Sequence, residues 1–213
     1  MKKIKLPFIE DLHFDNLHVI EKALLEKGQH FNIDVINWEE YSYLPKVDTY
    51  IARNKTHIVI LYKVDGLDLR AKAFVDNGPV WKDSCCEFFV SHPSDSTYYN
   101  FELNCIGTLL VAKRTSRHDP KPWTQEQLNQ VLRFSSLERK EYDISGKVEP
   151  WSVAMCIPLE LIGLKDELPH ELRANFYKCG DETANPHFVS WNPINLASPD
   201  FHCPQFFGTL VIE

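Results

Sequence analysis

The sequence predicts an all-β protein, an antiparallel β-sandwich with one or two peripheral helices. Many short segments alternate apolar and polar residues or are rich in β-branched residues, thirteen prolines interrupt the chain, and few segments have helical spacing. Short strands separated by turn residues are typical of sandwiches, whereas parallel sheets need longer helical crossovers.

Six segments carry the strand signal: 56–62, 85–91, 100–112, 151–157, 173–179 and 207–213. Successive side chains of a strand point to opposite faces, so each strand should have one core face. In 85–91 the core face would hold Cys86, Phe88 and Val90, with Glu87 on the other face.

Two segments carry helix signals. The first follows Asp15, a good N-cap residue, and Gly28 can close it. The second is expected near 124–134, where Thr124 and Gln127 have capping-box spacing. A single helical turn is also expected over 157–163.

Length and charge limit the function classes. The chain of 213 residues fits one domain, 1–213, that can bury a full core. A net charge of -7 and a pI near 5.7 argue against a nucleic-acid partner. No apolar run approaches the roughly 20 residues of a membrane helix, so we expect no membrane partner. We also expect a monomer.

The cysteines and the first residues suggest a compartment. The start "MKKIKLPFIEDLHF" has basic residues but no apolar stretch of the secretory type. A cytoplasmic location is therefore expected, with a secreted or periplasmic location as the alternative. A domain of this length does not need disulfides, so free thiols are expected at all six cysteines. They are Cys85, Cys86, Cys105, Cys156, Cys179 and Cys203.

Two tryptophans stand in turn-rich surroundings. Trp191 precedes Asn-Pro in "PHFVSWNPI" (186–194), and Trp81 follows Gly-Pro in "NGPVWKDSCCEFF". An indole beside a polar loop can stack on the apolar face of a pyranose, whose hydroxyl groups then need polar partners. Core packing is the alternative for each tryptophan, and it is the expectation for Trp151 in its alternating strand.

Polar residues on strand faces are candidates for those partners. They are Glu87, Glu102, Asn104, Arg173, Asn175 and Tyr177. Carboxylates accept and amides both donate and accept hydrogen bonds, which suits vicinal hydroxyl groups. A sheet with one solvated face would show the same pattern, so both interpretations stay open.

Catalytic and metal sites are weaker alternatives. Glu87 and Glu102 could form the carboxyl pair of a glycosidase. Calcium could bind the acidic loops 64–68, 92–96 and 179–183. A zinc cluster has little support because no Cys-x-x-Cys or His-x-x-x-His pair is present; its members would be Cys179, His187, His202 and Cys203.

Four segments together resemble the family 9 carbohydrate-binding modules, and most closely a stand-alone branch found in gut bacteria. They are "NGPVWKDSCCEFFVS", "YYNFELNCIGTLL", "RANFYKCGD" and "PHFVSWNPI…PDFHCPQFFGTLVIE". The resemblance runs from about residue 30 to the carboxyl end. It implies a jelly-roll β-sandwich, structural calcium, and a site where two tryptophans grip the end unit of a glycan chain.

The resemblance also assigns individual residues. Trp81 and Trp191 match the two stacking tryptophans, and Glu87 matches an acidic residue six positions after the first. Glu102 and Asn104 fall on a strand that carries a polar pair, although the well-studied branch has a basic residue at the position of Glu102. We therefore predict non-catalytic sugar binding linked to polysaccharide catabolism. A glycosidase and a protein-interaction module remain the alternatives.

Overall fold

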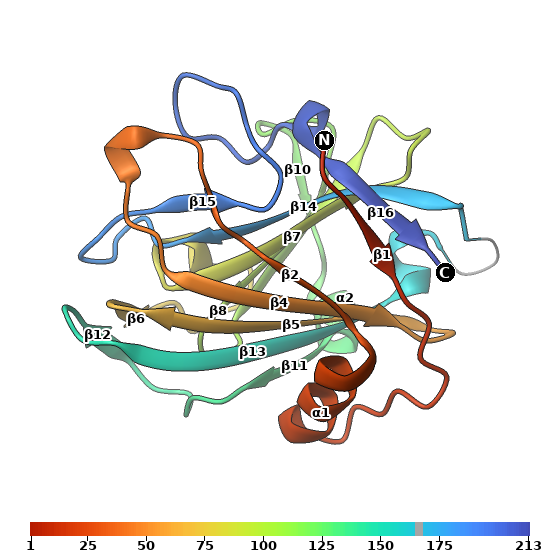
Figure 1. Cartoon of the computed structure of the whole chain (residues 1–213), viewed down its shortest axis with the longest axis horizontal. Helices are drawn as coiled ribbons and strands as arrows, with labels where there is room; N and C mark the ends of the chain where they lie inside the picture. The colour runs from red at the N-terminus through yellow and green to blue at the C-terminus, as the bar shows by residue number, and fades with distance from the viewer. Residues whose placement is uncertain (165–167) are drawn as a thin grey trace.

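The computed structural model describes residues 1–164 and 168–213, which form two packed layers of β-sheet (Figure 1). The strands are β1 (Lys3–Leu6), β2 (Gln29–Asn32), β3 (Val35–Ile36), β4 (Lys46–Arg53), β5 (His57–Gly66), β6 (Leu69–Ala71), β7 (Cys85–Ser91), β8 (Tyr98–Asn104), β9 (Leu109–Arg114), β10 (Pro120–Pro122), β11 (Leu132–Ser135), β12 (Tyr142–Ile144), β13 (Glu149–Pro158), β14 (Glu171–Cys179), β15 (Phe188–Ser190) and β16 (Gly208–Ile212). The helices are α1 (Leu17–Lys27) and α2 (Gln125–Gln130), and the 3₁₀ turns are η1 (Glu39–Tyr41), η2 (Val80–Lys82), η3 (Leu159–Ile162) and η4 (Pro204–Phe206).

The larger sheet has the strand order β1-β16-β14-β7-β8-β9-β10, and β15 and β3 extend it from β14. The smaller layer has the order β11-β13-β5-β4-β2, and β12 and β6 form a separate pair. Neighbouring strands are antiparallel except β1 and β16, which run parallel. The predicted antiparallel sandwich is therefore confirmed.

The core lies between the two layers and follows the predicted alternation. Cys86, Phe88 and Val90 of β7 are buried there together with Phe101 and Phe176 of the flanking strands. The ring of Phe88 stacks on Phe176 at 5.0 Å and on Phe101 at 6.2 Å between centroids. Burying each such side chain contributes about 1.5–3 kcal/mol, so this layer fixes the larger sheet firmly.

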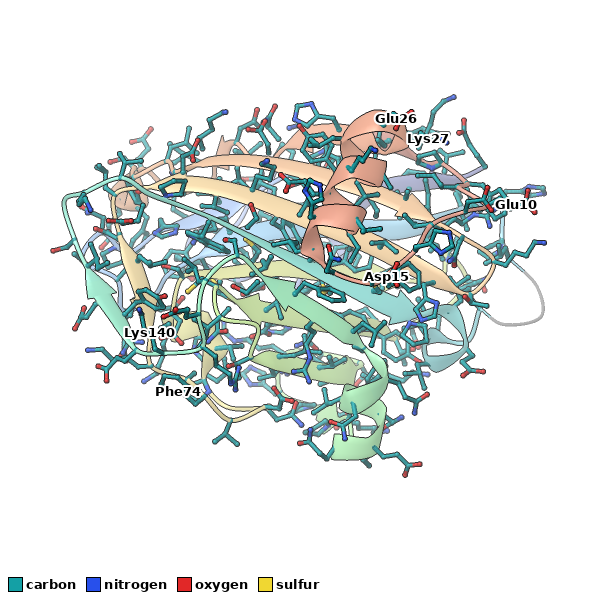
Figure 2. All side chains as sticks on the ribbon, turned by 90° about the horizontal axis from the view of Figure 1, so that it is seen from below. Glu10, Asp15, Glu26, Lys27, Phe74 and Lys140 are labelled. Atoms are coloured by element: carbon teal, nitrogen blue, oxygen red, sulfur yellow. The ribbon has the colours of Figure 1, made fainter. Side chains whose placement is uncertain are left out.

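Helix α1 covers the outer face of the smaller layer, where Ile20 and Leu24 pack on apolar residues of β4, β5 and β13. Figure 2 shows the helix lying across these strands, with Asp15 before its start and Glu26 and Lys27 at its end. Its N-cap is Asn16, whose Oδ1 accepts a hydrogen bond from the Val19 amide at 3.1 Å. The predicted N-cap, Asp15, is thus wrong by one residue, and the predicted end of the helix at Gly28 is confirmed.

The predicted strand 100–112 is two strands with a tight turn between them. Oδ1 of Asn104 accepts hydrogen bonds from the amides of Ile106 and Thr108 at 3.3 and 2.8 Å. Gly107 adopts φ 83°, which a residue without Cβ reaches at low cost. An amide side chain that satisfies the turn backbone therefore reverses the chain in the middle of an apolar run.

The second predicted helix is shorter than expected. The capping box of Thr124 and Gln127 is present, but α2 ends at Gln130. Residues 132–135 instead pair with β13 as strand β11. Pairing with an open sheet edge thus outweighs the local helical preference after Gln130.

All six cysteines are buried free thiols, as predicted. Within the described ranges, no helix is both long enough and apolar enough to cross a lipid bilayer.

Candidate functional site

The outer face of the larger sheet is mostly covered rather than solvated. Phe89 of β7, Tyr98 of β8 and Tyr177 of β14 point away from the core and pack beneath residues that include Phe201 and Phe207. The segment that follows β15 therefore forms a second layer over this face. An opening remains beside it.

This opening is a pocket of about 260 Å³. It is lined by Trp81, Glu87, Glu102, Arg114, Arg117, Cys179, Asp181, Phe188, Pro199, Asp200, Phe201 and His202. Strands β7, β8, β9 and β14 supply the bottom, and the loops around residues 81, 117, 181 and 200 supply the rim.

Two carboxyl groups form the floor of the pocket. Glu87 and Glu102 are direct register partners on β7 and β8, and both are nearly fully buried. Side chains at such positions have Cβ atoms about 4.5–5.5 Å apart, so the carboxyl groups stand side by side. Burial raises the pKa of Glu102 to about 7. It also raises the pKa of Glu87 well above its ordinary value, and Cys179 and Glu102 add to that shift.

A short hydrogen-bond chain holds Glu102 in place. Nε of Arg114 donates to Oδ1 of Asn100 at 2.9 Å, and Nδ2 of Asn100 donates to Oε1 of Glu102 at 2.9 Å. Arg114 also donates through Nη1 to the carbonyl of Arg117 at 2.7 Å. The guanidinium thus links the floor to the loop after β9 and places donors at the pocket wall.

The opposite rim is built by residues 200–202. Oδ1 of Asp200 accepts a hydrogen bond from the His202 amide at 2.8 Å and lies 3.5 Å from Nη1 of Arg117. Nδ1 of His202 lies 3.0 Å from the hydroxyl of Tyr98. Burial, together with Arg114 and Arg117, lowers the pKa of His202 to about 3, so the ring is neutral.

Trp81 supplies an aromatic wall from turn η2. The residue is 36% exposed, and its carbonyl accepts a hydrogen bond from the Asp181 amide at 3.2 Å. A second aromatic ring comes from Phe201, which stacks on Tyr177 at 4.1 Å with an interplanar angle of 7°. The hydroxyl of Tyr177 donates to the Phe201 carbonyl at 3.1 Å and fixes that loop.

The structure therefore gathers Trp81, Glu87 and Glu102 around one pocket, but it does not bring Trp191 there. Trp191 is 2% exposed, with ring centroids 5.7 Å from both Phe31 and Phe176. The prediction that it forms a wall of an open slot is wrong. The backbone amide of Trp191 donates to the Phe176 carbonyl at 2.8 Å and holds Trp191 against β14. The polar turn is formed by the residues that follow Trp191.

The other predicted site residues hold loops in place. Nδ2 of Asn104 donates to the Ala73 carbonyl and to Asp83, both at 3.0 Å, and so anchors the loop that leads to Trp81. Asn175 donates to the Asn192 carbonyl at 3.1 Å. Within the described part of the chain, neither these two residues nor Arg173 and Tyr177 line the pocket.

Arg173 and Tyr177 secure the segment over the sheet. Arg173 donates through Nη2 to the carbonyls of Pro204 and Phe207 at 3.0 and 3.3 Å. Together with the bond from Tyr177 to Phe201, these contacts give the strand face a structural role. The alternative that this face of β14 is solvated is also wrong, because the segment after β15 covers it.

Several pocket residues were not predicted to bind sugar, although Cys179 and His202 were named for zinc and Asp181 lies in a loop named for calcium. They are Arg114, Arg117, Cys179, Asp181, Phe188, Pro199, Asp200, Phe201 and His202. Arg114 carried a usable signal, since it lies two residues beyond Ala112 on a strand that pairs with Glu102 and Asn100. The loop residues carried none, because only long-range packing brings them to the pocket.

The predicted metal sites are not assembled as expected. Cys203 donates through its thiol to the carbonyl of Asp200, His202 contacts Tyr98, and His187 lies 2.8 Å from the Lys178 ammonium. The four-residue zinc cluster is therefore wrong.

In the acidic loops suggested for calcium, several of the described carboxyl groups are engaged by neighbouring protein groups. Glu182 binds Arg70 and Lys82, Asp95 accepts from the Thr97 amide, and no group of three ligating side chains gathers in these loops. Oδ1 of Asp68 is buried without a hydrogen-bond partner, but one carboxylate is too little for a calcium site. One group that does gather, Cys85, Glu87 and Cys179, lies at the pocket floor.

A β-sandwich with a small polar pocket and an exposed indole at its edge defines a ligand-binding domain. The chain belongs to carbohydrate-binding family 9, whose family model matches residues 18–212. The predicted family is thus confirmed, and membership supports non-catalytic carbohydrate binding.

Solved structures agree with this assignment. A protein of Bacteroides uniformis ATCC 8492, proposed to bind carbohydrate, is 37% identical with a TM-score of 0.92, and the match covers 100% of this chain and 99% of that one. A family 9 module of Caldicellulosiruptor kristjanssonii, solved with glucose and with cellotriose, is 10% identical. Its two structures have TM-scores of 0.62 and 0.59, with all of this chain and 96% and 94% of theirs covered. At that identity the likeness concerns the fold alone. No curated protein is similar enough to this chain to count as a relative.

Proposed function

We propose that this protein binds the end unit of a glycan chain in the pocket beside Trp81, without cleaving it, and serves polysaccharide catabolism. The observation that carries the proposal is a partly exposed indole beside a pocket with charged donors and acceptors. An indole offers a flat apolar surface for one face of a pyranose ring.

The polar lining suits hydroxyl groups. Arg114 and Arg117 can donate hydrogen bonds, while Asp181 and Asp200 can accept them. Burial raises the pKa of Asp181 to about 6. The positive charge of Arg117 lowers this pKa, and the negative charge of Glu182 raises it. Both signs of charge are present on the lining, so a neutral sugar meets partners for several of its hydroxyl groups.

The size of the pocket favours one sugar unit. Its volume of about 260 Å³ lies just below the roughly 300–1,000 Å³ typical of small-molecule sites. A site of this size holds a chain end more readily than a long internal stretch of polysaccharide. With few groups buried on binding, the affinity should be modest.

Calorimetric titration with a panel of monosaccharides and short oligosaccharides tests the proposal. The parent protein should bind at least one member, and Trp81→Ala should weaken that binding roughly tenfold or more, the effect of losing about 1.4 kcal/mol. Phe8→Ala is the matched control, because Phe8 is 40% exposed but lies outside the pocket. Equal affinity of the parent and Trp81→Ala would reject this pocket as the sugar site.

A further inference from the structure

Two cysteines and a glutamate meet at the floor of the pocket. Cys85 on β7 and Cys179 on β14 are register partners, and Glu87 lies two residues beyond Cys85 on the same strand face. The two Sγ atoms and a carboxylate oxygen of Glu87 all lie within 4.8 Å of one another. The thiol of Cys179 donates to Oε1 of Glu87 at 3.0 Å. All three side chains are buried, and they come from two rigid central strands.

This donor set has the composition of a zinc site. Zinc binds thiolate sulfur at about 2.3 Å and carboxylate oxygen at about 2.0–2.2 Å, so the donors of a tetrahedral site lie roughly 3.5–3.8 Å apart. The triad spans up to 4.8 Å, so its side chains must rotate inward for the three donor atoms to reach one ion. Two sulfur ligands favour zinc and other thiophilic ions over calcium and magnesium.

The surroundings leave room for a fourth ligand. Cys179 and Glu87 both line the pocket, so the open side of the triad faces the cavity rather than the core. Three protein ligands with one open position are typical of zinc sites that exchange a water or a bound molecule. The fourth position would hold water or an oxygen of a molecule in the pocket.

A zinc complex at the triad would be anionic. Two thiolates and one carboxylate around Zn²⁺ carry a net charge of -1. Lys178 precedes Cys179 on β14 and therefore points to the opposite face of the sheet, where its buried ammonium donates to the Cys179 carbonyl at 2.6 Å and contacts His187 at 2.8 Å. Its charge offsets that of the complex only from across the sheet.

We propose that Cys85, Cys179 and Glu87 bind Zn²⁺, with the fourth coordination position open to the pocket. On binding, each thiol and the carboxyl group releases its proton to solvent as its sulfur or oxygen bonds to the metal. No oxidant or reductant is required.

Cobalt and zinc binding to the full-length protein, reduced and stripped with a chelator, tests the proposal. Co²⁺ should give thiolate-to-metal charge-transfer absorption in the near ultraviolet, and Zn²⁺ should displace it at one equivalent. Cys85→Ser and Cys179→Ser should each lower zinc affinity by roughly a hundredfold or more, since even an outer partner of a metal ligand costs about 10–100-fold. Cys86→Ala is the matched control, because Cys86 is the neighbouring thiol on the core face of β7.

The parent spectrum decides the matter even if a variant fails to fold. Cobalt bound without a thiolate band, or no zinc uptake by the reduced protein, would overturn the proposal. A Cys85–Cys179 disulfide in the isolated protein would do so as well if its reduction restored no zinc binding. Trp81→Ala should keep full zinc affinity, so loss of sugar binding and loss of zinc binding are separate outcomes.

Discussion

The indole of Trp191 packs against Gly208 so closely that no side chain fits between them. A Cβ atom added to Gly208 would lie 2.7 Å from Cη2 of the ring and 2.7 Å from the Lys2 carbonyl oxygen. Trp191 therefore closes the core beneath β16 and β1, whereas Trp81 stands at the surface. The two residues should respond differently to the same substitution.

Trp191→Ala should lower the free energy of unfolding by about 3–5 kcal/mol, because it leaves a large cavity in a closely packed core. Urea denaturation followed by fluorescence or circular dichroism measures this change. Trp81→Ala is the comparison and should change stability by less than about 1 kcal/mol, since its indole is partly solvated. Similar losses in the two variants would contradict the assignment of Trp191 to the core.

Gly208→Ala should also destabilise the protein, by about 1–3 kcal/mol, because the new methyl group meets both a ring and a backbone oxygen. Combining it with Trp191→Phe, which shortens the ring, should cost less than the sum of the two single changes. A double-mutant cycle in urea checks this coupling. If the two changes in the free energy of unfolding simply add, the ring of residue 191 and the side chain at position 208 do not clash.

Sequence reasoning found the sandwich because strand alternation is a local property. Phe88 and Glu87 could be assigned to opposite faces from their spacing alone, and the structure agrees. The two tryptophans could not be distinguished in this way, since both stand beside turn residues. Their different positions depend on contacts with residues far away in the sequence. The amide of Trp191 is hydrogen-bonded to the Phe176 carbonyl and its ring faces the core, while Trp81 lies on a turn at the pocket edge.

The pocket residues also show that only residues on strands can be placed from local sequence patterns. Glu87 and Glu102 were found because they are acidic residues inside apolar strands. Asp200, Phe201 and His202 were missed because their position depends on bonds such as that from Tyr177 to the Phe201 carbonyl. Residues on strands can thus be predicted from periodicity, but rim residues need the packed loop.

Tyr177→Phe should test how that loop supports the pocket. The ring stack with Phe201 would remain, but the hydrogen bond to its carbonyl would be lost. We expect a stability loss of about 1 kcal/mol and a several-fold weaker affinity for whichever sugar binds, measured by denaturation and calorimetry. Tyr50→Phe in the other sheet is the control and should leave sugar affinity unchanged. Unaltered binding by Tyr177→Phe would show that this hydrogen bond is not needed to position Phe201 at the site.

The paired carboxyl groups should not hydrolyse glycosides. A glycosidase places its two carboxyl groups on either side of the scissile bond, about 5–9 Å apart. Glu87 and Glu102 are direct register partners on one sheet surface, so both carboxyl groups would face a bound sugar from the same side. We therefore expect no release of chromophore from aryl glycosides of any sugar that binds. Turnover that is lost in Glu87→Gln, with sugar binding retained, would make the protein an enzyme.

The raised pKa of Glu102 should make stability depend on pH. The carboxyl group keeps its proton up to a pKa of about 7 in the folded protein, compared with an ordinary value of 4.5. Between these values this group binds more protons in the folded state than in the unfolded chain, so its contribution to the free energy of unfolding falls as pH rises from about 4.5 to 7. The loss from this group is on the order of 3 kcal/mol and is complete above pH 7.

Glu102→Gln should remove the part of the slope that this group contributes because the amide does not titrate. Urea midpoints measured at intervals from pH 4.5 to 8 compare the variant with the parent. Glu87, whose pKa is also raised by burial, contributes a fall of the same sign, so a residual slope in Glu102→Gln is expected and should shrink further when Glu87→Gln is added. A slope unchanged by both substitutions would show that these carboxyl groups ionise freely in the fold and that the pocket floor is wetter than its burial indicates.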